Sequence, residues 1–373
     1  MWPSLADPYW TASFWVGGIT LGLTGVLLVV LFVLKLTAQS RLRQDHRFDR
    51  TWQPVLIRAA LDEDGVPALP TLRPGDDWRL IKLWVRFQSS LKGSARERLR
   101  ELGLQLQCQH RARPLLNSPH RSEQIFGILC LGYLRDESAW PLLVSRLDDV
   151  RNSVFIYVAW ALLQLSPERA SPIVVDQLLR RRDLNVLQAS TVLKPFRRVL
   201  HEPLLFQLSL HLSLHVARAS TDEAPGEPSG ADPAALAWLF RLGLALGLTP
   251  TVDTLRPWLQ ADQPMDLIIG AMRLLQGPEG LEPVRLLANH PDWQVRTQVA
   301  VALGRLGDSN DVDLLIQLLM DSQWWVRYRA AQSLATTPFV DRAAMQARVS
   351  SLPDRYARDM AHQVFLEIPA PSW

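Results

Sequence analysis

The fold of this chain is decided by a stretch that occurs twice. Residues 129–147 read LCLGYLRDESAWPLLVSRL and residues 301–319 read VALGRLGDSNDVDLLIQLL, and the two align without a gap at an offset of 172 residues. Leucine, glycine and aspartate coincide, as at Gly132 and Gly304. Each copy has apolar residues at helical spacing, then a short polar turn, then helical spacing again. The stretch therefore predicts a helical hairpin that is used more than once.

A shorter period runs through the C-terminal part. The segment WQVRTQVAVAL at 293–303 matches WWVRYRAAQSL at 324–334, 31 residues later. Each such unit holds two short helices, and each helix has one apolar stripe that only a neighbouring unit can bury. We therefore predict an all-α fold, an α-solenoid in which helix pairs stack into a right-handed superhelix.

The run DSQWWVRYRAAQSLA at 321–335 resembles the second helix of a HEAT repeat, with Asp321 and Arg327 at the family's polar positions. The resemblance is good over 118–195 and 278–340. It implies an armadillo-type solenoid in which aspartate and arginine side chains form a hydrogen-bonded ladder between repeats. That role is carried over only to Asp321, Arg327 and Arg296. The preceding copy has His290 in place of the aspartate, and the copy at 149–165 has Phe155 in place of the arginine.

An uncharged run of 21 residues, FWVGGITLGLTGVLLVVLFVL, occupies positions 14–34. It is long enough to span the hydrocarbon core of a bilayer. Lys35, Arg41 and Arg43 follow it, whereas no lysine or arginine precedes it, so the positive-inside rule predicts an N-terminus outside and everything later in the cytoplasm. A signal peptide is the alternative, but the run lacks a basic n-region and a cleavage site. We expect a single-pass protein of a bacterial inner membrane, in contact with the lipid bilayer through residues 14–36.

Prolines, glycines and a polar stretch indicate the remaining segment boundaries of the chain. Prolines and glycines between 54 and 75 predict a connector, and ASTDEAPGEPSGADP at 219–233 has no large apolar side chain and predicts a disordered loop. The alternating FQLSLHLSLHV at 206–216 is interpreted as helix, because a lone strand would have no partner. The expected order is an extracytoplasmic N-terminus (1–13), a transmembrane helix (14–36), a juxtamembrane connector (37–75), an N-terminal helical cap (76–115), HEAT-like repeats (116–218), the loop (219–233), further HEAT-like repeats (234–367) and a tail (368–373).

Composition and motifs give little support for catalysis. The net charge of +3 does not favour nucleic acid, and no GxGxxG, P-loop or GxSxG motif occurs. Cys108 and Cys130 have no partner at metal-ligand spacing, so we expect two core thiols in a reducing compartment. His211 and His215 stand four residues apart without a third ligand and are interpreted as polar-face residues. We expect no enzyme activity, no metal and no cofactor.

Two groups of residues are candidates for binding. Anions or acidic partners could bind the arginines that end one predicted helix and open the next element; the alternative is that they complement a helix dipole. A protein partner could bind aromatic and arginine side chains that point away from the core; the alternative is that they seal contacts between repeats. The anion candidates are Arg180, Arg181, Arg182, Arg197 and Arg198, and the partner candidates are Tyr157, Trp160, Trp325, Tyr328 and Arg329.

These features together predict a membrane-anchored HEAT-repeat scaffold that binds a protein partner, itself membrane-associated, in an envelope polysaccharide or signalling complex. Two alternatives come from other HEAT-like proteins: an enzyme or chaperone that resembles bilin lyases, and a repeat protein that binds phosphate or nucleic acid. The first would carry a visible chromophore, and the second would bind duplex with a strong dependence on salt.

Overall fold

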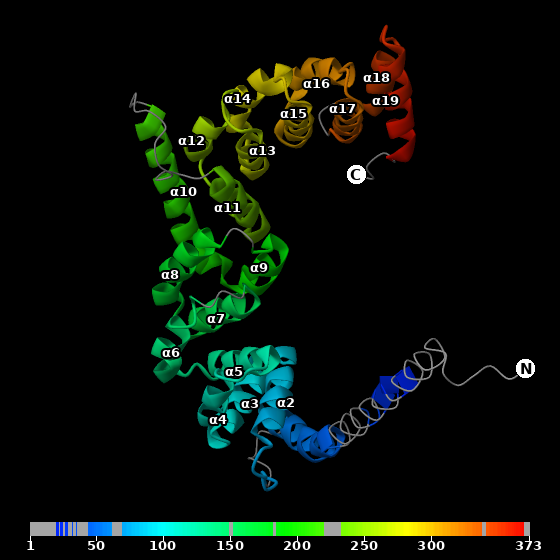
Figure 1. The fold of residues 1–373 in the computed structure, drawn as a ribbon. Coiled ribbons are helices and arrows are strands. Elements are labelled where there is room, and N and C mark those ends of the chain that lie inside the picture. Colours follow the sequence, from blue (N-terminus) through cyan, green and yellow to red (C-terminus); the bar gives the residue numbers. More distant parts are fainter. Residues whose placement is uncertain are drawn as a thin grey trace, which may run out of the picture. The chain divides into compact units, whose positions relative to one another are not determined.

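A computed structural model describes residues 44–61, 69–148, 152–181, 184–219, 233–337 and 341–368, with the single residues 20, 21, 23, 24, 27, 28, 32 and 35. The expected all-α fold is confirmed, since these residues contain helices and turns and no strand (Figure 1). The chain divides into two compact units, Met1–Ala139 and Trp140–Trp373.

The first unit is a small helical bundle. Its labelled helices are α2 (Asp77–Ser90), α3 (Gly93–Gln105), α4 (Cys108–Leu115), α5 (Arg121–Leu134) and the short η1 (Glu137–Ala139). Trp84 of α2 is fully buried and donates its indole N–H to the carbonyl of Leu99 at 2.9 Å. A Cβ at Gly103 would lie 2.7 Å from the Trp84 ring, so only glycine lets α3 approach the indole. Because α5 packs on α2 and α4, the unit extends beyond the helical cap expected at 76–115.

The connector expected at 37–75 is corrected by a helix at residues 44–61. Its side chains Phe48, Trp52 and Leu56 recur every four residues and are buried, and this stripe holds the helix against the bundle. Arginines of the bundle bind both ends of this helix. Arg79 pairs with Asp45 at 2.7 Å, and Arg98 donates to the carbonyl of Ala60 at 2.8 Å. The prolines predicted a loop, but the burial of apolar side chains at helical spacing stabilises a helix here instead.

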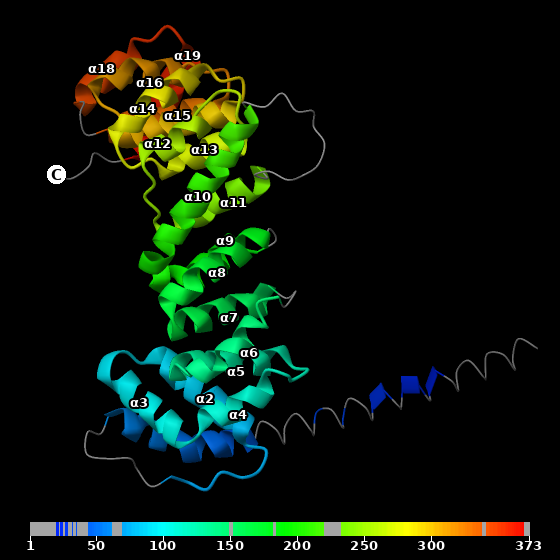
Figure 2. The same cartoon turned by 90° about the vertical axis from the view of Figure 1, so that its left-hand side faces the viewer.

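The second unit is a stack of helix pairs (Figure 2). The helices α7, α9, α11, α13, α15, α17 and α19 form one row in which each packs against the next, and most of them also pack on the helix that precedes them in the chain. The bounds are α6 (Trp140–Val144), α7 (Asn152–Leu165), α8 (Pro167–Arg180), α9 (Val186–Leu193), α10 (Arg197–Ala219), α11 (Pro233–Leu246), α12 (Val252–Leu255), α13 (Met265–Leu274), α14 (Leu281–Leu286), α15 (Trp293–Leu306), α16 (Val312–Leu319), α17 (Trp324–Thr336), α18 (Arg342–Ser350) and α19 (Arg355–Glu367), with short 3₁₀ turns η2 (Lys194–Phe196), η3 (Arg256–Trp258), η4 (Pro278–Gly280), η5 (Leu287–Asn289) and η6 (Ser309–Asp311).

The contact between α15 and α17 shows why glycine recurs in the repeat. The hydroxyl of Ser333 donates to the carbonyl of Ala300 at 2.8 Å, which brings the two helices together. A Cβ on Gly304 would lie 2.3 Å from the Ser333 Oγ. The glycine therefore allows neighbouring repeats to approach closely.

The helix interpretation of 206–216 is confirmed, since the segment lies inside α10. The loop expected at 219–233 falls outside the described residues except for its ends, which belong to α10 and α11; so do the N-terminus at 1–13 and the tail after Ile368. Most of 14–36 also lies outside them. Within the described part of the chain, no helix combines the length and apolar character needed to cross a membrane.

Candidate partner-binding surface

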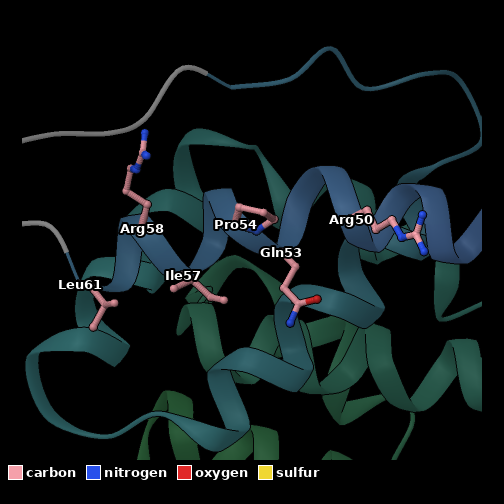
Figure 3. A pocket seen from close by; sticks show the side chains of 6 residues that line it. All are labelled: Arg50, Gln53, Pro54, Ile57, Arg58 and Leu61. Atoms are coloured by element: carbon pink, nitrogen blue, oxygen red, sulfur yellow. The ribbon is translucent and has the colours of Figure 1, made fainter.

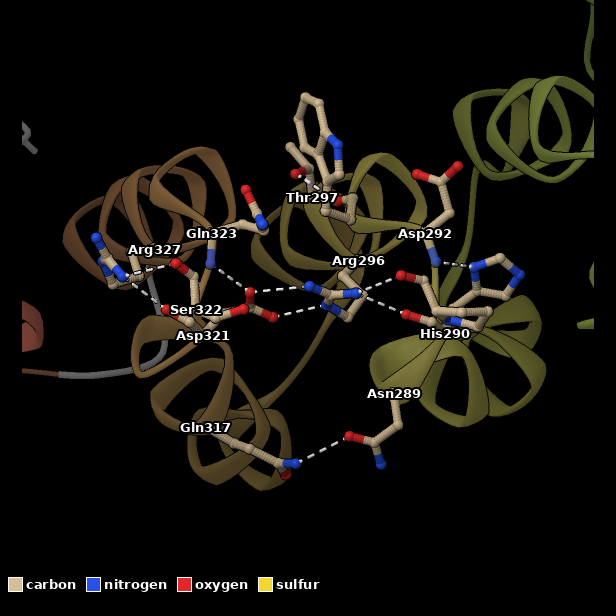
Figure 4. A network of polar contacts seen from close by, with 12 residues as sticks. Asn289, His290, Asp292, Arg296, Thr297, Gln317, Asp321, Ser322, Gln323 and Arg327 are labelled. Carbon is tan, nitrogen blue, oxygen red and sulfur yellow. Dashed lines mark hydrogen bonds and ion pairs between the residues drawn. The ribbon is translucent and has the colours of Figure 1, made fainter.

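The predicted ladder exists between α15 and the turn before α17 (Figure 4). The Arg296 guanidinium makes two parallel contacts with the Asp321 carboxylate, at 2.6 and 2.9 Å. Both side chains are largely buried, 14% and 10% exposed. Burial by itself raises the pKa of Asp321, but hydrogen bonds from Arg296 and from the Gln323 N–H outweigh it and hold that pKa below its usual range. Asp321 is therefore an ionised link between two successive repeats.

Arginines of the second helices also hold the preceding turns. Arg296 donates to the carbonyl of His290 at 2.8 Å, and Arg327 donates to the carbonyl of Asp321 at 2.8 Å. Arg358 of α19 repeats the contact by donating to the carbonyl of Leu352 at 2.5 Å, and it also donates to that of Pro353 at 3.1 Å. The three arginines are 31 residues apart. Our sequence reasoning missed the last copy, although extending the 31-residue offset by one step would have found it.

A second ion pair of the same kind was also missed. Arg285 of α14 holds the carboxylate of Asp311 at 2.7 and 3.0 Å, and the Asp311 side chain is only 2% exposed. Burial raises the pKa of Asp311, but the Arg285 contact and the Asp308 N–H outweigh it and lower that pKa overall. No motif in the sequence marks this pair.

The described anion candidates differ in their surroundings. Arg180 pairs with Asp176 at 3.0 Å, and Arg182 lies outside the described residues. Arg181 donates to the carbonyl of Leu147 at 2.6 Å and lies 4.4 Å from the centre of the Phe155 ring. Arg181 is thus engaged by a backbone carbonyl and by the Phe155 ring. This is a structural role, and it corrects the expectation of an anion site at Arg181.

Arg197 and Arg198 stand apart from that contact. Both are exposed in the first turn of α10. A helix N-terminus carries positive partial charge, so these arginines do not complement the dipole of their own helix. They remain available to solvent without forming a defined pocket.

The partner candidates separate into two groups. Trp160 of α7 is 8% exposed, and Tyr157 is half-buried. The expectation that Trp160 lies on a binding stripe is therefore corrected, because its indole is buried inside the unit. The burial of Trp160 favours the alternative interpretation, that tall aromatics pack between repeats.

On α17 the aromatic side chains are at the surface instead. Trp324 and Trp325 are 44% and 52% exposed, and Tyr328 is half-buried between them and the helix. The rings of Trp324 and Tyr328 stack at 5.0 Å and 11°, while Trp325 meets Trp324 edge-on at 4.7 Å and 89°. We call these three residues the aromatic patch. Trp324 was not among the predicted site residues, although it adjoins Trp325 in the sequence.

The surroundings of the aromatic patch are polar and basic. Arg329 is exposed one residue beyond Tyr328 and donates to Gln332 at 2.8 Å. Tyr356 of α19, 69% exposed, lies 5.8 Å from the guanidinium of Arg327. Such a surface offers planar apolar faces held rigid by their mutual stacking, and an arginine beside them. It is suited to binding a partner side chain rather than to acid–base chemistry.

Titratable groups elsewhere are buried without forming a reactive cluster. Cys108 and Cys130 are both fully buried free thiols, as expected for core residues, and burial raises the pKa of Cys130 well above its usual value. Burial likewise lowers the pKa of His211. Among the residues with described positions, no three His, Cys, Asp or Glu side chains are gathered as metal ligands.

Comparison with known proteins agrees with this architecture. Residues 252–335 match the family described as HEAT repeats, and no curated protein matches the chain. This match begins at residue 252, before the stretch from 278 in which the sequence resembles HEAT repeats. Together with the stacked helix pairs, it identifies a HEAT-repeat helical solenoid.

Several solved structures are similar at a lower level. The karyopherin Kap121p, bound to the extreme C-terminus of the protein phosphatase Cdc14p, has a TM-score of 0.44 and 14% identity. The match covers 82% of this chain and 40% of that one, so this chain spans less than half of the karyopherin. Human deoxyhypusine hydroxylase has a TM-score of 0.26 and 18% identity, over 78% of this chain and 98% of that one. Likeness at this level carries no conclusion about what this chain binds.

Proposed function

We propose that this chain is a membrane-anchored HEAT-repeat scaffold that binds a protein partner through the aromatic patch. The observation that carries the proposal is the exposure of Trp324 and Trp325, two large aromatic side chains side by side on one helix. Soluble surfaces rarely leave such groups in water without a binding role, and tryptophan and arginine are the residues most enriched in binding hot spots. The role is binding, not catalysis.

The anchor is the second part of the proposal. The apolar run at 14–34 supplies the length, and its described residues are helical. Leu23, Leu28 and Phe32 among them are 66%, 61% and 61% exposed, so these side chains have no protein core to bury them. A bilayer is the environment that suits an uncharged helix with such side chains. The partner is then a component of the same membrane or of its cytoplasmic face, in an envelope polysaccharide or signalling complex.

A pull-down from mild detergent through a C-terminal tag tests the binding role. The double variant Trp325→Ala/Tyr328→Ala should lose a partner that the wild type retains, and its melting temperature should stay unchanged. Leu286→Ala is the matched control, because Leu286 is an 80% exposed apolar side chain of α14 that the proposal does not use. Equal capture by the wild type and the double variant would refute the aromatic patch as the binding surface.

Orientation needs a separate test. The basic residues follow the apolar run, so alkaline phosphatase fused after Trp373 should be inactive in a bacterial host, and a cytoplasmic reporter at that position should be active. An active phosphatase fusion would place the solenoid on the other side of the membrane and contradict the proposed location.

A further inference from the structure

The helix at 44–61 has one face that the protein core does not use. Seven of its exposed residues recur at steps of three and four, which places them on one side of the helix. They are Arg47, Arg50, Thr51, Pro54, Ile57, Arg58 and Leu61, and Gln44, His46 and Gln53 are also exposed. Ile57 and Leu61 are 40% and 68% exposed, and a hollow of ≈ 630 Å³ opens along this face (Figure 3).

The acidic residues of this helix lie on its other side. Asp45 is paired with Arg79 at 2.7 Å and with Lys82 at 3.8 Å. Asp49 lines a small cavity with Arg79 and Arg86, both of α2. The sequence alone suggests that Asp45 and Asp49 dilute the basic flank of the anchor, but in the fold they face α2. The exposed face therefore carries three arginines, two apolar side chains and no carboxylate.

The position of this helix in the chain limits what the face can meet. Residues 37–43 are the seven that separate it from the transmembrane helix expected at 14–36. Seven residues reach at most roughly 25 Å when fully extended. If the anchor spans a bilayer, the first turn of the helix must lie close to the headgroup layer.

We propose that this face lies on the anionic phospholipid surface of the membrane that holds the anchor. Arg47 and Arg50 contact headgroup phosphates, while Ile57 and Leu61 enter the boundary between headgroups and acyl chains. Basic residues with adjoining apolar side chains are the pattern of helices that lie in a membrane interface. The inference rests on the proposed anchor and adds a second contact with the bilayer, which would fix the first unit against the membrane surface.

The test uses the full chain reconstituted in nanodiscs of phosphatidylcholine, with and without phosphatidylglycerol. A polarity-sensitive fluorophore on Leu61→Cys reports contact with lipid, because Cys108 and Cys130 are fully buried and stay unlabelled. Its emission should shift to the blue in discs with phosphatidylglycerol and return towards the aqueous value as salt is added. The same fluorophore on Leu286→Cys, in the other unit, should not respond.

Charge removal makes the test specific. Arg47→Gln/Arg50→Gln should weaken docking of the face about 25-fold, since each arginine near an anionic surface contributes roughly five-fold. The control Arg121→Gln/Arg256→Gln removes the same charge from two exposed arginines elsewhere and should leave the emission shift unchanged.

The outcomes separate this inference from the anchor. A chain that stays in the discs but shows no lipid-dependent shift at position 61 overturns the docked face and leaves the anchor intact. A chain that does not incorporate into the discs overturns both. A blue shift without lipid would mean that protein covers the face. Reversal by inorganic phosphate at an ionic strength at which sodium chloride has no effect would mean that the arginines bind phosphate in solution. Either result overturns the bilayer as the occupant.

Discussion

Replacing Asp321 by alanine should loosen the contact between two successive repeats. The carboxylate accepts two hydrogen bonds from Arg296 and one from the Gln323 N–H at 2.8 Å, and its side chain is 10% exposed. Removing one partner of a buried ion pair leaves the other charge uncompensated, which costs about 3–5 kcal/mol. We expect about 3 kcal/mol here, because Arg296 keeps two backbone carbonyl acceptors at 2.8 and 3.0 Å.

Amide hydrogen exchange is the suitable assay, because repeats open locally as well as globally. A loss of about 3 kcal/mol should accelerate exchange in peptides from α15 and α17 by roughly 100-fold. Asp313→Ala is the matched control. It removes an aspartate that also pairs with an arginine of the next helix pair, Arg348, but the two side chains are 80% and 51% exposed. An exposed pair contributes at most about 1 kcal/mol, so exchange should change by about five-fold or less.

The pH dependence of the same variant follows from the pKa of Asp321. Because that pKa is lower in the folded chain than its usual value of about 3.9, the pair stabilises the fold fully above that value. The stabilisation is lost as the pH falls through the folded pKa and the carboxylate is protonated. The difference in protection between wild type and Asp321→Ala should therefore be constant near neutrality and should shrink below about pH 4. Equal exchange in both proteins at neutral pH would refute the ladder as a stabilising link.

Three further outcomes can be measured by thermal unfolding followed by circular dichroism. Trp160→Ala should lower the free energy of unfolding by about 3–5 kcal/mol, whereas Trp325→Ala should change it by less than about 0.5 kcal/mol, because the first indole is 8% exposed and the second 52%; equal losses would contradict the division between packing and surface. Gly304→Ala should cost about 1–3 kcal/mol, since its Cβ would meet Ser333, and Ser333→Gly in the same chain should recover part of that loss. Arg181→Met should destabilise the chain, because the carbonyl of Leu147 would lose its donor, whereas Arg180→Met should have little effect, since its pair with Asp176 is exposed.

The apolar periodicity of the sequence predicted the helices of the fold. The apolar stripes of 293–303 and 324–334 lie on α15 and α17. The segment 206–216 alternates like a strand but is helical, because it belongs to α10 and the segments around it are helices. The helix at 44–61 was missed for a local reason. Pro54 and the prolines and glycines up to residue 75 suggested a loop, while the burial of Phe48, Trp52 and Leu56 depends on helices that follow much later.

The exposure of the candidate binding residues could be predicted from the sequence less well than the helices. Under the 172-residue offset, Tyr157 corresponds to Arg329 and Trp160 to Gln332. Yet Tyr157 and Trp160 are each more buried than their counterparts. The difference arises because exposure at one helical position depends on the side chains that the neighbouring helices supply.

The sequence by itself determined the helix pairs and their period, because these depend on residues at fixed local spacing, and the resemblance to HEAT repeats pointed to Arg296 and Asp321 as ladder residues. Only the tertiary structure decided which aromatics remain in water, that Arg181 packs on Phe155 and donates to the carbonyl of Leu147, and that Asp45 faces α2 rather than the arginines of its own helix. The physical reason is the same in each case. Local spacing fixes the side of a helix on which a residue lies, whereas burial and charge pairing are fixed by what packs against that side, and the packing partners come from distant parts of the chain.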